Sequence, residues 1–206
     1  MNQPIQTMTN HSATRPDFAL ISQWVKPHAK VLDLGCGDGE LLTHLHQAHD
    51  IRGYGIEKDD HNWLIAMENG VDVLQMDLET GLSGFEDQSF DTVILSQTLQ
   101  AMHNTEGIVK EMLRVGREAV VTFPNFGYWR NRYQIMFGQM PVSKTLPYQW
   151  YDTPNVHLCT IHDFDAFCQN HHISVIERKV ITDGKDVKFM PNLLGNLAMY
   201  RLKSTT

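Results

Sequence analysis

The sequence predicts an α/β domain that is built on a mainly parallel sheet. Three observations indicate this fold. Short apolar runs alternate with helix-like segments from residue 30 to residue 123, a glycine-rich turn directly follows the first run, and 206 residues are enough for one domain with one substantial core. The apolar fraction of 42% and the charged fraction of 20% are ordinary for a globular protein and exclude a disordered or fibrous chain.

Order is expected to begin near residue 15. Residues 1–14 are polar and have no hydrophobic period, so we interpret them as a flexible arm that precedes a single domain over residues 15–206. The arm also lacks the apolar run of a signal peptide. Asp17 is predicted to cap a helix whose apolar stripe covers residues 18–25 and which ends at Pro27.

The remaining elements follow from hydrophobic periodicity. Apolar and β-branched runs predict strands over residues 30–34, 53–56, 71–76, 90–95, 119–123, 173–182 and 196–202. Amphipathic segments predict helices over residues 40–48, 60–69, 105–115 and 163–170. Gly70 is expected at the C′ position that ends the second of these helices.

Residues 124–160 interrupt this alternation. They contain four prolines and little periodicity, and such a long stretch without regular elements is usually functional or disordered. Ten of the nineteen Phe, Trp and Tyr residues lie between positions 123 and 164, which argues against disorder. We therefore interpret the segment as a folded, aromatic-rich cap over the carboxyl edge of the sheet.

Charge and cysteine content narrow the possible functions. The formal net charge of −7 argues against nucleic acid and anionic membranes as partners, because both are bound through clustered Lys and Arg. No run approaches the ~20 apolar residues of a membrane-spanning helix.

Cys36, Cys159 and Cys168 lack the spacing of a disulfide framework and predict reduced thiols in the cytoplasm. No metal site is predicted, since the cysteines and nearby His157 and His162 lack the paired spacing of zinc ligands.

The turn after residues 30–34 predicts a nucleotide site. Its sequence, Gly35-Cys36-Gly37-Asp38-Gly39, lets backbone N–H groups approach a ligand at the start of a helix. A dinucleotide fingerprint needs its third glycine where this sequence has Glu40, and the carboxylates of Asp38 and Glu40 would repel a pyrophosphate. No Gly-Lys-Ser/Thr follows, which excludes a P-loop. A purely structural turn is the simpler alternative.

S-adenosylmethionine (SAM) fits this site better, because it carries no phosphate and its ammonium and sulfonium groups are positive. Asp33 can bind the ammonium, Glu57 ends the second strand where a carboxylate accepts bonds from ribose, and Asp77 can accept from the adenine amino group. Each carboxylate has an alternative role, as a helix cap or a solvated strand end. The predicted residues for SAM or S-adenosylhomocysteine (SAH) are Asp33, Gly35, Cys36, Gly37, Asp38, Gly39, Glu57, Lys58, Asp77, Leu78, Ser96 and Gln97.

No catalytic residue is assigned. The segment after the fourth strand, beside the predicted methyl donor, holds Gln100, which cannot act as a base near pH 7. His103 could substitute, or it could be an ordinary surface histidine. The candidates for contact with a substrate or partner are Gln100, Asn125, Tyr128, Trp129, Arg130, Arg132 and Trp150. Their aromatic and arginine side chains are typical of interfaces, but the aromatics could equally form the core of the cap and the arginines its rim.

Several segments also resemble one family. VLDLGCGDGELL and SFDTVILSQTLQA are typical of class I SAM-dependent methyltransferases, and FPNFGYWRNR and LPYQWYDTPNVHLCT are similar to the MetW family of methionine-biosynthesis proteins. The resemblance covers residues 15 to about 182. It implies a Rossmann-like class I methyltransferase fold, with a seven-stranded, mostly parallel sheet whose last strand is antiparallel, and a SAM-type pocket.

The resemblance also implies a role as a required or regulatory partner of the MetX-type homoserine O-acyltransferase. The alternative is a free-standing SAM-dependent methyltransferase that acts on a small molecule. An RNA methyltransferase is a weaker third possibility, because the chain is acidic and has no basic stripe.

Overall fold

The computed structural model describes residues 15–205 and places eight strands in one sheet. The strands are β1 (Lys30–Leu34), β2 (Arg52–Glu57), β3 (Asp72–Gln75), β4 (Phe90–Ser96), β5 (Gly116–Pro124), β6 (Ile173–Thr182), β7 (Lys185–Asp186) and β8 (Leu197–Ser204). The α-helices are α1 (Pro16–Ser22), α2 (Glu40–His49), α3 (Asp60–Glu68), α4 (Thr105–Val115), α5 (Trp129–Met136), α6 (Ile161–Asn170) and α7 (Pro191–Leu194). Two short 3-10 turns, η1 (Leu78–Thr80) and η2 (Leu99–Ala101), follow β3 and β4.

The sheet is parallel on one side and antiparallel on the other. Its order is β3-β2-β1-β4-β5-β8-β6-β7, and the pairs from β3 to β5 are all parallel. β8 runs antiparallel between β5 and β6. The predicted mostly parallel sheet with an antiparallel last strand is therefore confirmed. Because the chain order reverses between β1 and β4, the carboxyl ends of these strands leave a crevice at which α/β sheets bind ligands.

The sheet has one more strand than the seven that were expected. β7 forms a hairpin with β6, with Thr182 paired to Lys185. The two residues between them, Asp183 and Gly184, have φ angles of 49° and 76°. Positive φ at both positions is the requirement of a type I′ turn, for which Asp-Gly is a preferred sequence. The Asp-Gly pair was thus a readable hairpin signal that our interpretation of the sequence did not use.

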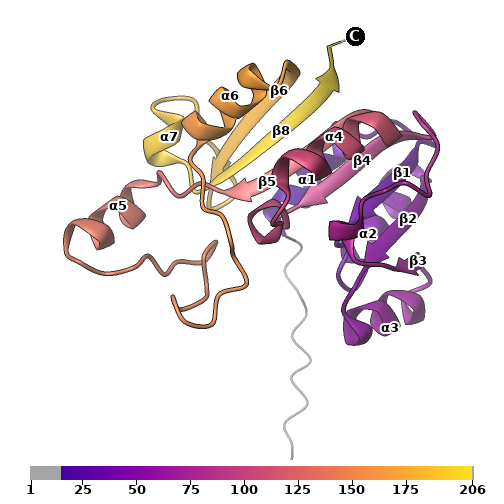
Figure 1. The fold of residues 1–206 in the computed structure, drawn as a ribbon, viewed down its shortest axis with the longest axis horizontal. Helices are drawn as coiled ribbons and strands as arrows, with labels where there is room; N and C mark the ends of the chain where they lie inside the picture. The colour runs from indigo at the N-terminus through magenta and orange to yellow at the C-terminus, as the bar shows by residue number, and fades with distance from the viewer. Residues whose placement is uncertain (1–14, 206) are drawn as a thin grey trace, which may run out of the picture.

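Helices cover both faces of the sheet and enclose two apolar clusters (Figure 1). On one face, α4 and α6 pack residues such as Met112 and Phe164 against β4, β5 and β8. On the other, α1 and α2 contribute Phe18, Ile21 and Leu45. A sheet buried on both faces explains why the strands read as continuous apolar runs instead of alternating ones.

The start of α1 differs from the prediction. The helix begins at Pro16 with Arg15 in the N-cap position, and no side chain caps it. Asp17 was expected as the cap but lies inside the first turn and is fully buried. The helix also ends at Ser22, short of the predicted end at Pro27. The predicted flexible arm, residues 1–14, lies outside the described residues. Among residues 15–205, no helix has the length and apolar character that crossing a bilayer requires.

The aromatic cap contains one helix, α5, followed by residues 137–160, which form neither helix nor strand. In Figure 1 α5 projects from the sheet on the side away from β1–β3. The segment returns to the sheet at Gln100, whose carbonyl oxygen accepts hydrogen bonds from the N–H groups of Val156 (2.8 Å) and His157 (3.0 Å). This contact brings part of the cap to the carboxyl edge.

Candidate functional site

The glycine turn is shaped by three residues in the left-handed region. Gly35, Gly37 and Gly39 have φ angles of 70°, 58° and 79°, which side chains other than glycine rarely adopt. A Cβ on Gly39 would lie 2.6 Å from the Val71 side chain, and one on Gly35 would lie 3.0 Å from Thr98. A Cβ on Gly37 would meet no atom within 4 Å. Gly37 therefore turns its Cα toward open space, where a ligand can approach the backbone.

Glu57 joins this turn to the end of β2. Its carboxylate is 9% exposed, accepts a hydrogen bond at Oε2 from the Gly37 N–H (2.9 Å), and accepts at Oε1 from the N–H groups of Lys58 (2.8 Å) and Asp59 (2.9 Å). A carboxylate offers about four lone-pair directions. One direction on Oε2 is left, so Glu57 can shape the turn and still accept a bond from a ligand.

Asp33 is a buried carboxylate beneath the same turn. It is 2% exposed, and its Oδ1 has no hydrogen-bond partner among the described residues. The pKa of Asp33 is raised to about 7, chiefly by burial. The positive charge of Arg15 opposes this rise, and the negative charge of Glu57 adds to it. A buried oxygen without a partner is costly, and a positive group placed beside it would relieve that cost.

The raised pKa has a consequence for stability. The folded protein keeps the Asp33 proton up to about pH 7, whereas the unfolded chain releases it near pH 3.8. The folded state thus binds more protons in this window, and its stability falls as pH rises through it. Relative to Asp33→Asn, the wild-type free energy of unfolding should fall by about 2 kcal/mol between pH 5 and pH 7. Urea denaturation of both proteins measures this difference, and parallel pH profiles would contradict it.

A cavity of about 430 Å³ lies at the carboxyl ends of β2, β3 and β4. It is lined by Gly35, Ile56, Glu57, Lys58, Met76, Asp77, Leu78, Glu79, Thr98, Ala101, Met102, His103, Pro154 and Val156. Five of the twelve predicted cofactor residues are among them: Gly35, Glu57, Lys58, Asp77 and Leu78. Pro154 and Val156 were not predicted, because they come from the cap, where the sequence carries no periodic signal.

The lining of this cavity is acidic. Glu57, Asp77 and Glu79 contribute three carboxylates, against one lysine, Lys58. Asp77 accepts from the Glu79 N–H through Oδ1 (3.0 Å) and begins η1, while Leu78 is buried behind it. An acidic cavity with an apolar wall disfavours phosphates and favours a cationic ligand with a flat, apolar part.

The other predicted cofactor residues surround the cavity without lining it. Asp38 is exposed and accepts from the Glu40 N–H (3.1 Å). Cys36 is buried, and burial raises the pKa of its thiol to about 12, so it is not a nucleophile at neutral pH. Ser96 and Gln97 both bond to Asp17 of α1, at 3.4 Å and 3.1 Å. That contact was not predicted, because nothing local in the sequence links α1 to the end of β4.

The partner candidates fall into two groups. Asn125 and Tyr128 are buried, and the Asn125 amide bonds to four backbone groups, so its polar atoms are used within the fold. Trp129, Arg130, Arg132 and Trp150 are exposed, with Arg130 stacked over the Trp129 ring at 5.4 Å. Gln100 is half-buried, and its Nε2 donates to the Gln97 carbonyl (2.6 Å).

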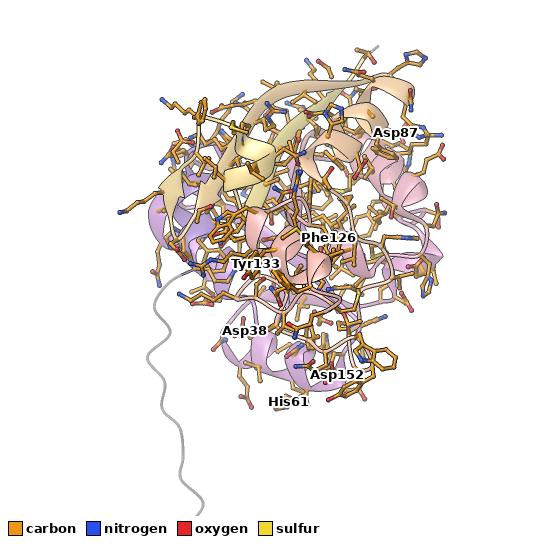
Figure 2. All side chains as sticks on the ribbon, turned by 90° about the vertical axis from the view of Figure 1, so that its left-hand side faces the viewer. Asp38, His61, Asp87, Phe126, Tyr133 and Asp152 are labelled. Carbon is orange, nitrogen blue, oxygen red and sulfur yellow. The ribbon has the colours of Figure 1, made fainter. Side chains whose placement is uncertain are left out.

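The cap aromatics are mostly surface residues. Eleven of the twenty exposed large apolar side chains among residues 15–205 lie between positions 129 and 158. Trp150 and Tyr151 are each 71% exposed, and Tyr133 is 55% exposed. Figure 2 faces this side of the molecule, with Phe126 and Tyr133 near its centre. We call residues 129–158 the cap surface. An apolar patch of this extent is typical of a binding face.

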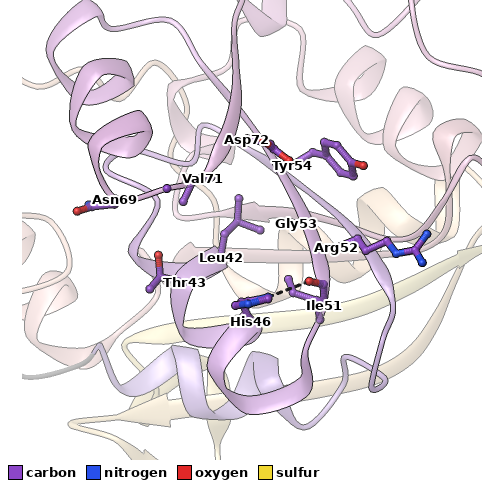
Figure 3. Close-up of a pocket in the computed structure, with 11 residues that line it drawn as sticks. Leu42, Thr43, His46, Ile51, Arg52, Gly53, Tyr54, Asn69, Val71 and Asp72 are labelled. Carbon is purple, nitrogen blue, oxygen red and sulfur yellow. Dashed lines mark hydrogen bonds between the residues drawn. The ribbon is translucent and has the colours of Figure 1, made fainter.

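A second cavity, of about 290 Å³, lies at the opposite, amino-terminal ends of β2 and β3 (Figure 3). It contains none of the predicted site residues, and its His46 bonds within the fold, to the Ile51 carbonyl oxygen at 3.0 Å. Within residues 15–205, no three His, Cys, Asp or Glu side chains are grouped so that they could hold a metal ion.

The strand order and the glycine turn define the class I SAM-dependent methyltransferase fold. A SAM-dependent methyltransferase from Mesorhizobium loti matches with a TM-score of 0.68 and 13% identity over 92% of this chain and 98% of that one. Magnesium protoporphyrin IX methyltransferase from Synechocystis, solved with bound SAH, matches with a TM-score of 0.63 and 17% identity over 91% and 82% of the two chains. At these identities the likeness concerns the fold alone.

Within this class, the chain belongs to the family of methionine biosynthesis protein MetW, which matches residues 15–202. The bifunctional methionine biosynthesis protein MetXA/MetW of Rhodopirellula baltica is 35% identical over 199 residues. The match covers 89% of this chain and 32% of the relative, so this chain spans about a third of that protein's length. The family resemblance read from the sequence is thereby confirmed.

Proposed function

We propose that this protein binds SAM or SAH and acts as a required or regulatory partner subunit of a MetX-type homoserine O-acyltransferase. The proposal is carried by one juxtaposition. The apolar cap surface includes Pro154 and Val156, which also line the acidic cavity at the strand ends. A ligand in the cavity and a protein on the cap surface would therefore contact the same segment.

The cavity chemistry fits the ligand. Glu57 has one lone-pair direction left for a ribose hydroxyl, and Asp77 Oδ2 has no hydrogen bond within residues 15–205, which leaves it for an adenine amino group. Leu78 and Met76 supply an apolar wall for the ring. The unpartnered oxygen of Asp33 fits the ligand's ammonium. When bound, SAM would supply an activated methyl group, whereas this chain's residues bind and orient it.

The partner assignment rests on the relative and on the cap. In Rhodopirellula baltica the MetW-like region is part of one chain named MetXA/MetW, and fused domains are held close to each other at high effective concentration. Association without such a fusion would require a surface on the MetW-like region that binds the acyltransferase. The exposed aromatics of the cap surface, with Arg130 and Arg132 beside them, are the residue types that dominate interface energies.

One observation favours the alternative of a free-standing small-molecule methyltransferase. His103 lines the cavity, and a histidine there can take a proton from an acceptor near neutral pH. If this function is the correct one, the purified protein alone converts SAM to SAH when it is given the small-molecule filtrate of a cell extract. The partner-subunit function predicts no turnover under these conditions.

Reconstitution tests the partner-subunit function. Purified acyltransferase is assayed with homoserine and acyl-CoA, with and without this protein, and with and without SAM. We expect activity to require this protein even when SAM is absent, with SAM changing only the rate. An acyltransferase that is equally active alone would overturn the proposal.

Single substitutions test whether the cap surface is the part of this protein that binds the acyltransferase. Trp150→Ala and Trp129→Ala should weaken the complex by about 2 kcal/mol or more, the size of a buried aromatic hot spot, which is a loss of about 30-fold in affinity. Leu74→Ala is the matched control, because Leu74 is also exposed (53%) but lies on β3, at the edge of the sheet remote from α5. Equal affinity of both tryptophan variants and wild type would exclude the cap surface as the interface.

A further inference from the structure

Helix α5 is inverted relative to an ordinary surface helix. Its one buried side chain is that of Asn131, whose Nδ2 donates to the carbonyl oxygens of Asn125 (3.2 Å) and Phe126 (3.4 Å). Its large apolar side chains lie in solvent instead, with Trp129 44% and Met136 71% exposed. A surface helix normally buries its apolar face and exposes its polar one. The helix is therefore attached to the fold by hydrogen bonds, and most of its apolar face is uncovered.

The exposed side chains form a stripe along the helix. The stripe consists of four residues at the spacing i, i+4, i+7 and i+8, which lie on one side of a helix: Trp129, Tyr133, Met136 and Phe137. The Tyr133 and Phe137 rings are in contact, with their centroids 4.6 Å apart. Figure 1 shows that α5 projects from the sheet. A projecting helix with anchors at this spacing fits a groove on a partner better than a flat surface.

The two arginines of α5 carry charges that no carboxylate neutralises. The Arg130 side chain makes no hydrogen bond or ion pair with any residue from 15 to 205, and its guanidinium lies over the Trp129 ring. Within the same residues, the Arg132 side chain donates only to the carbonyl oxygens of Gly127 and Asn192. Five of the other six arginines of the chain pair with a carboxylate, namely Arg15, Arg114, Arg117, Arg178 and Arg201.

The cap surface as a whole is depleted of acidic groups. Residues 129–158 hold three basic residues, Arg130, Arg132 and Lys144, and one acidic residue, Asp152, so their formal charge is +2. The full chain has a formal charge of −7, which leaves −9 for the other residues. Interface cores are rich in aromatic residues, methionine and arginine and poor in aspartate and glutamate. The cap surface is therefore complementary to a partner surface that is apolar and acidic.

A second copy of this chain is a poorer match for α5. All but one of the 24 acidic residues of the chain lie outside the cap surface. Charge pairing between two copies would therefore join the cap of one copy to a different face of the other. Such head-to-tail contacts build rings or filaments instead of a two-fold dimer. A different protein with an acidic face is the better match.

We propose that α5 is a docking helix, whose aromatic stripe enters an apolar groove on the acyltransferase while Arg130 and Arg132 meet carboxylates at the rim of that groove. This inference rests on the proposed function, which supplies the partner. The two parts of the helix act on different rates, because opposite charges speed the encounter of two proteins, whereas buried aromatic side chains slow their dissociation. The docking helix therefore predicts an association rate that depends on salt.

Surface plasmon resonance with the purified acyltransferase tests the docking helix. Wild-type association should slow by about 10-fold or more between about 50 mM and about 500 mM NaCl, because salt screens the attraction. Arg130→Glu should slow association about 10-fold at the lower salt concentration and by less than about 2-fold at the higher one. Tyr133→Ala should instead raise the dissociation rate about 10-fold and leave the association rate within about 2-fold of wild type.

Arg52→Glu is the matched control for the change of charge. Arg52 is exposed, like Arg130, and is the remaining arginine without a carboxylate partner among residues 15–205. It begins β2, and α5 projects on the side away from that strand. This variant should keep both rates within about 2-fold of wild type. The Arg130 and Tyr133 side chains are exposed and make no hydrogen bonds within residues 15–205, so their variants should fold, which circular dichroism verifies.

The outcomes separate this inference from the proposed function. If the acyltransferase binds wild type but Arg130→Glu associates no more slowly than Arg52→Glu, or Tyr133→Ala dissociates at the wild-type rate, α5 is not the docking helix and the proposed function stands. If the acyltransferase does not bind wild type at all, the proposed function fails together with this inference. Sedimentation of this protein alone gives a further test, because self-association that Arg130→Glu abolishes would assign the helix to a second copy and overturn the inference.

Discussion

Glu57→Ala is expected to weaken SAH binding by about 100-fold or more. The variant would lose the charge-assisted bond that Glu57 is proposed to make to ribose, which by itself would contribute about 1.5–3 kcal/mol. The variant also removes the acceptor of the Gly37 N–H. Gly37 is the residue of the glycine turn that borders open space, so this part of the turn loses its anchor. The loss should therefore exceed that of a residue that only touches the ligand, such as Asp77.

Calorimetry with SAH measures this effect, and Glu68→Ala is its matched control. Glu68 is a glutamate on the exposed side of α3 and lines neither cavity. Circular dichroism would verify that Glu57→Ala keeps its secondary structure. Wild-type affinity in a folded Glu57→Ala protein would mean that the cavity at the carboxyl ends of β2, β3 and β4 is not the nucleotide site.

Asn125→Ala is expected to destabilise the protein by about 4 kcal/mol, which corresponds to a decrease in melting temperature of about 10 °C. Asn125 is 1% exposed, and its Nδ2 donates to the carbonyl oxygens of Asn192 (3.1 Å) and Gly195 (2.8 Å). Its Oδ1 accepts from the N–H groups of Gly127 (3.0 Å) and Ile161 (3.3 Å). One amide thus joins the end of β5 to the start of the cap, the start of α6 and both ends of α7.

Two further variants make this prediction specific. Asn125→Asp keeps the acceptor oxygen but turns a negative charge toward two carbonyl oxygens, and should be about as destabilising as alanine. Asn170→Ala, at the exposed end of α6, should stay within about 0.5 kcal/mol of wild type. Thermal and urea denaturation measure all three. An Asn125→Ala protein of normal stability that failed to bind the acyltransferase would instead place Asn125 in the interface.

The candidate site and the cap are held in place by different side chains. Glu57 shapes the turn beside the cavity, whereas Asn125 anchors the segment that carries the cap surface. A substitution that loosens the cap should impair the proposed partnership with the acyltransferase without removing the proposed affinity for SAM or SAH, provided that the sheet stays folded. The reverse is expected for Glu57→Ala. Measuring both variants in both assays tests whether ligand binding and partner activation depend on each other.

Seven of the eight strands, the helices α1–α4 and α6, and the glycine turn were predicted from the sequence alone. The reason is that these features are local: hydrophobic periodicity over a few residues specifies strand or helix, and the spacing of Gly35, Gly37 and Gly39 specifies a left-handed turn. Residues 173–182 were predicted as a strand and form β6 with the same limits. Glu57 and Asp77 were located by the same logic, because parallel strands bring their carboxyl ends to one edge.

The partner that each polar side chain takes could be seen only in the three-dimensional structure. Asp17 has the residue type and position of a helix cap, yet it is buried against Gln97, 80 residues along the chain. Asn125 reads as a pocket or turn residue, and becomes a buried anchor through carbonyls 67 and 70 residues away. The aromatics of the cap could have formed a core or a surface, and their exposure depends on how the whole segment lies on the sheet. Such contacts join residues that are distant in sequence, so they depend on the packing of the whole chain and leave no local pattern to read.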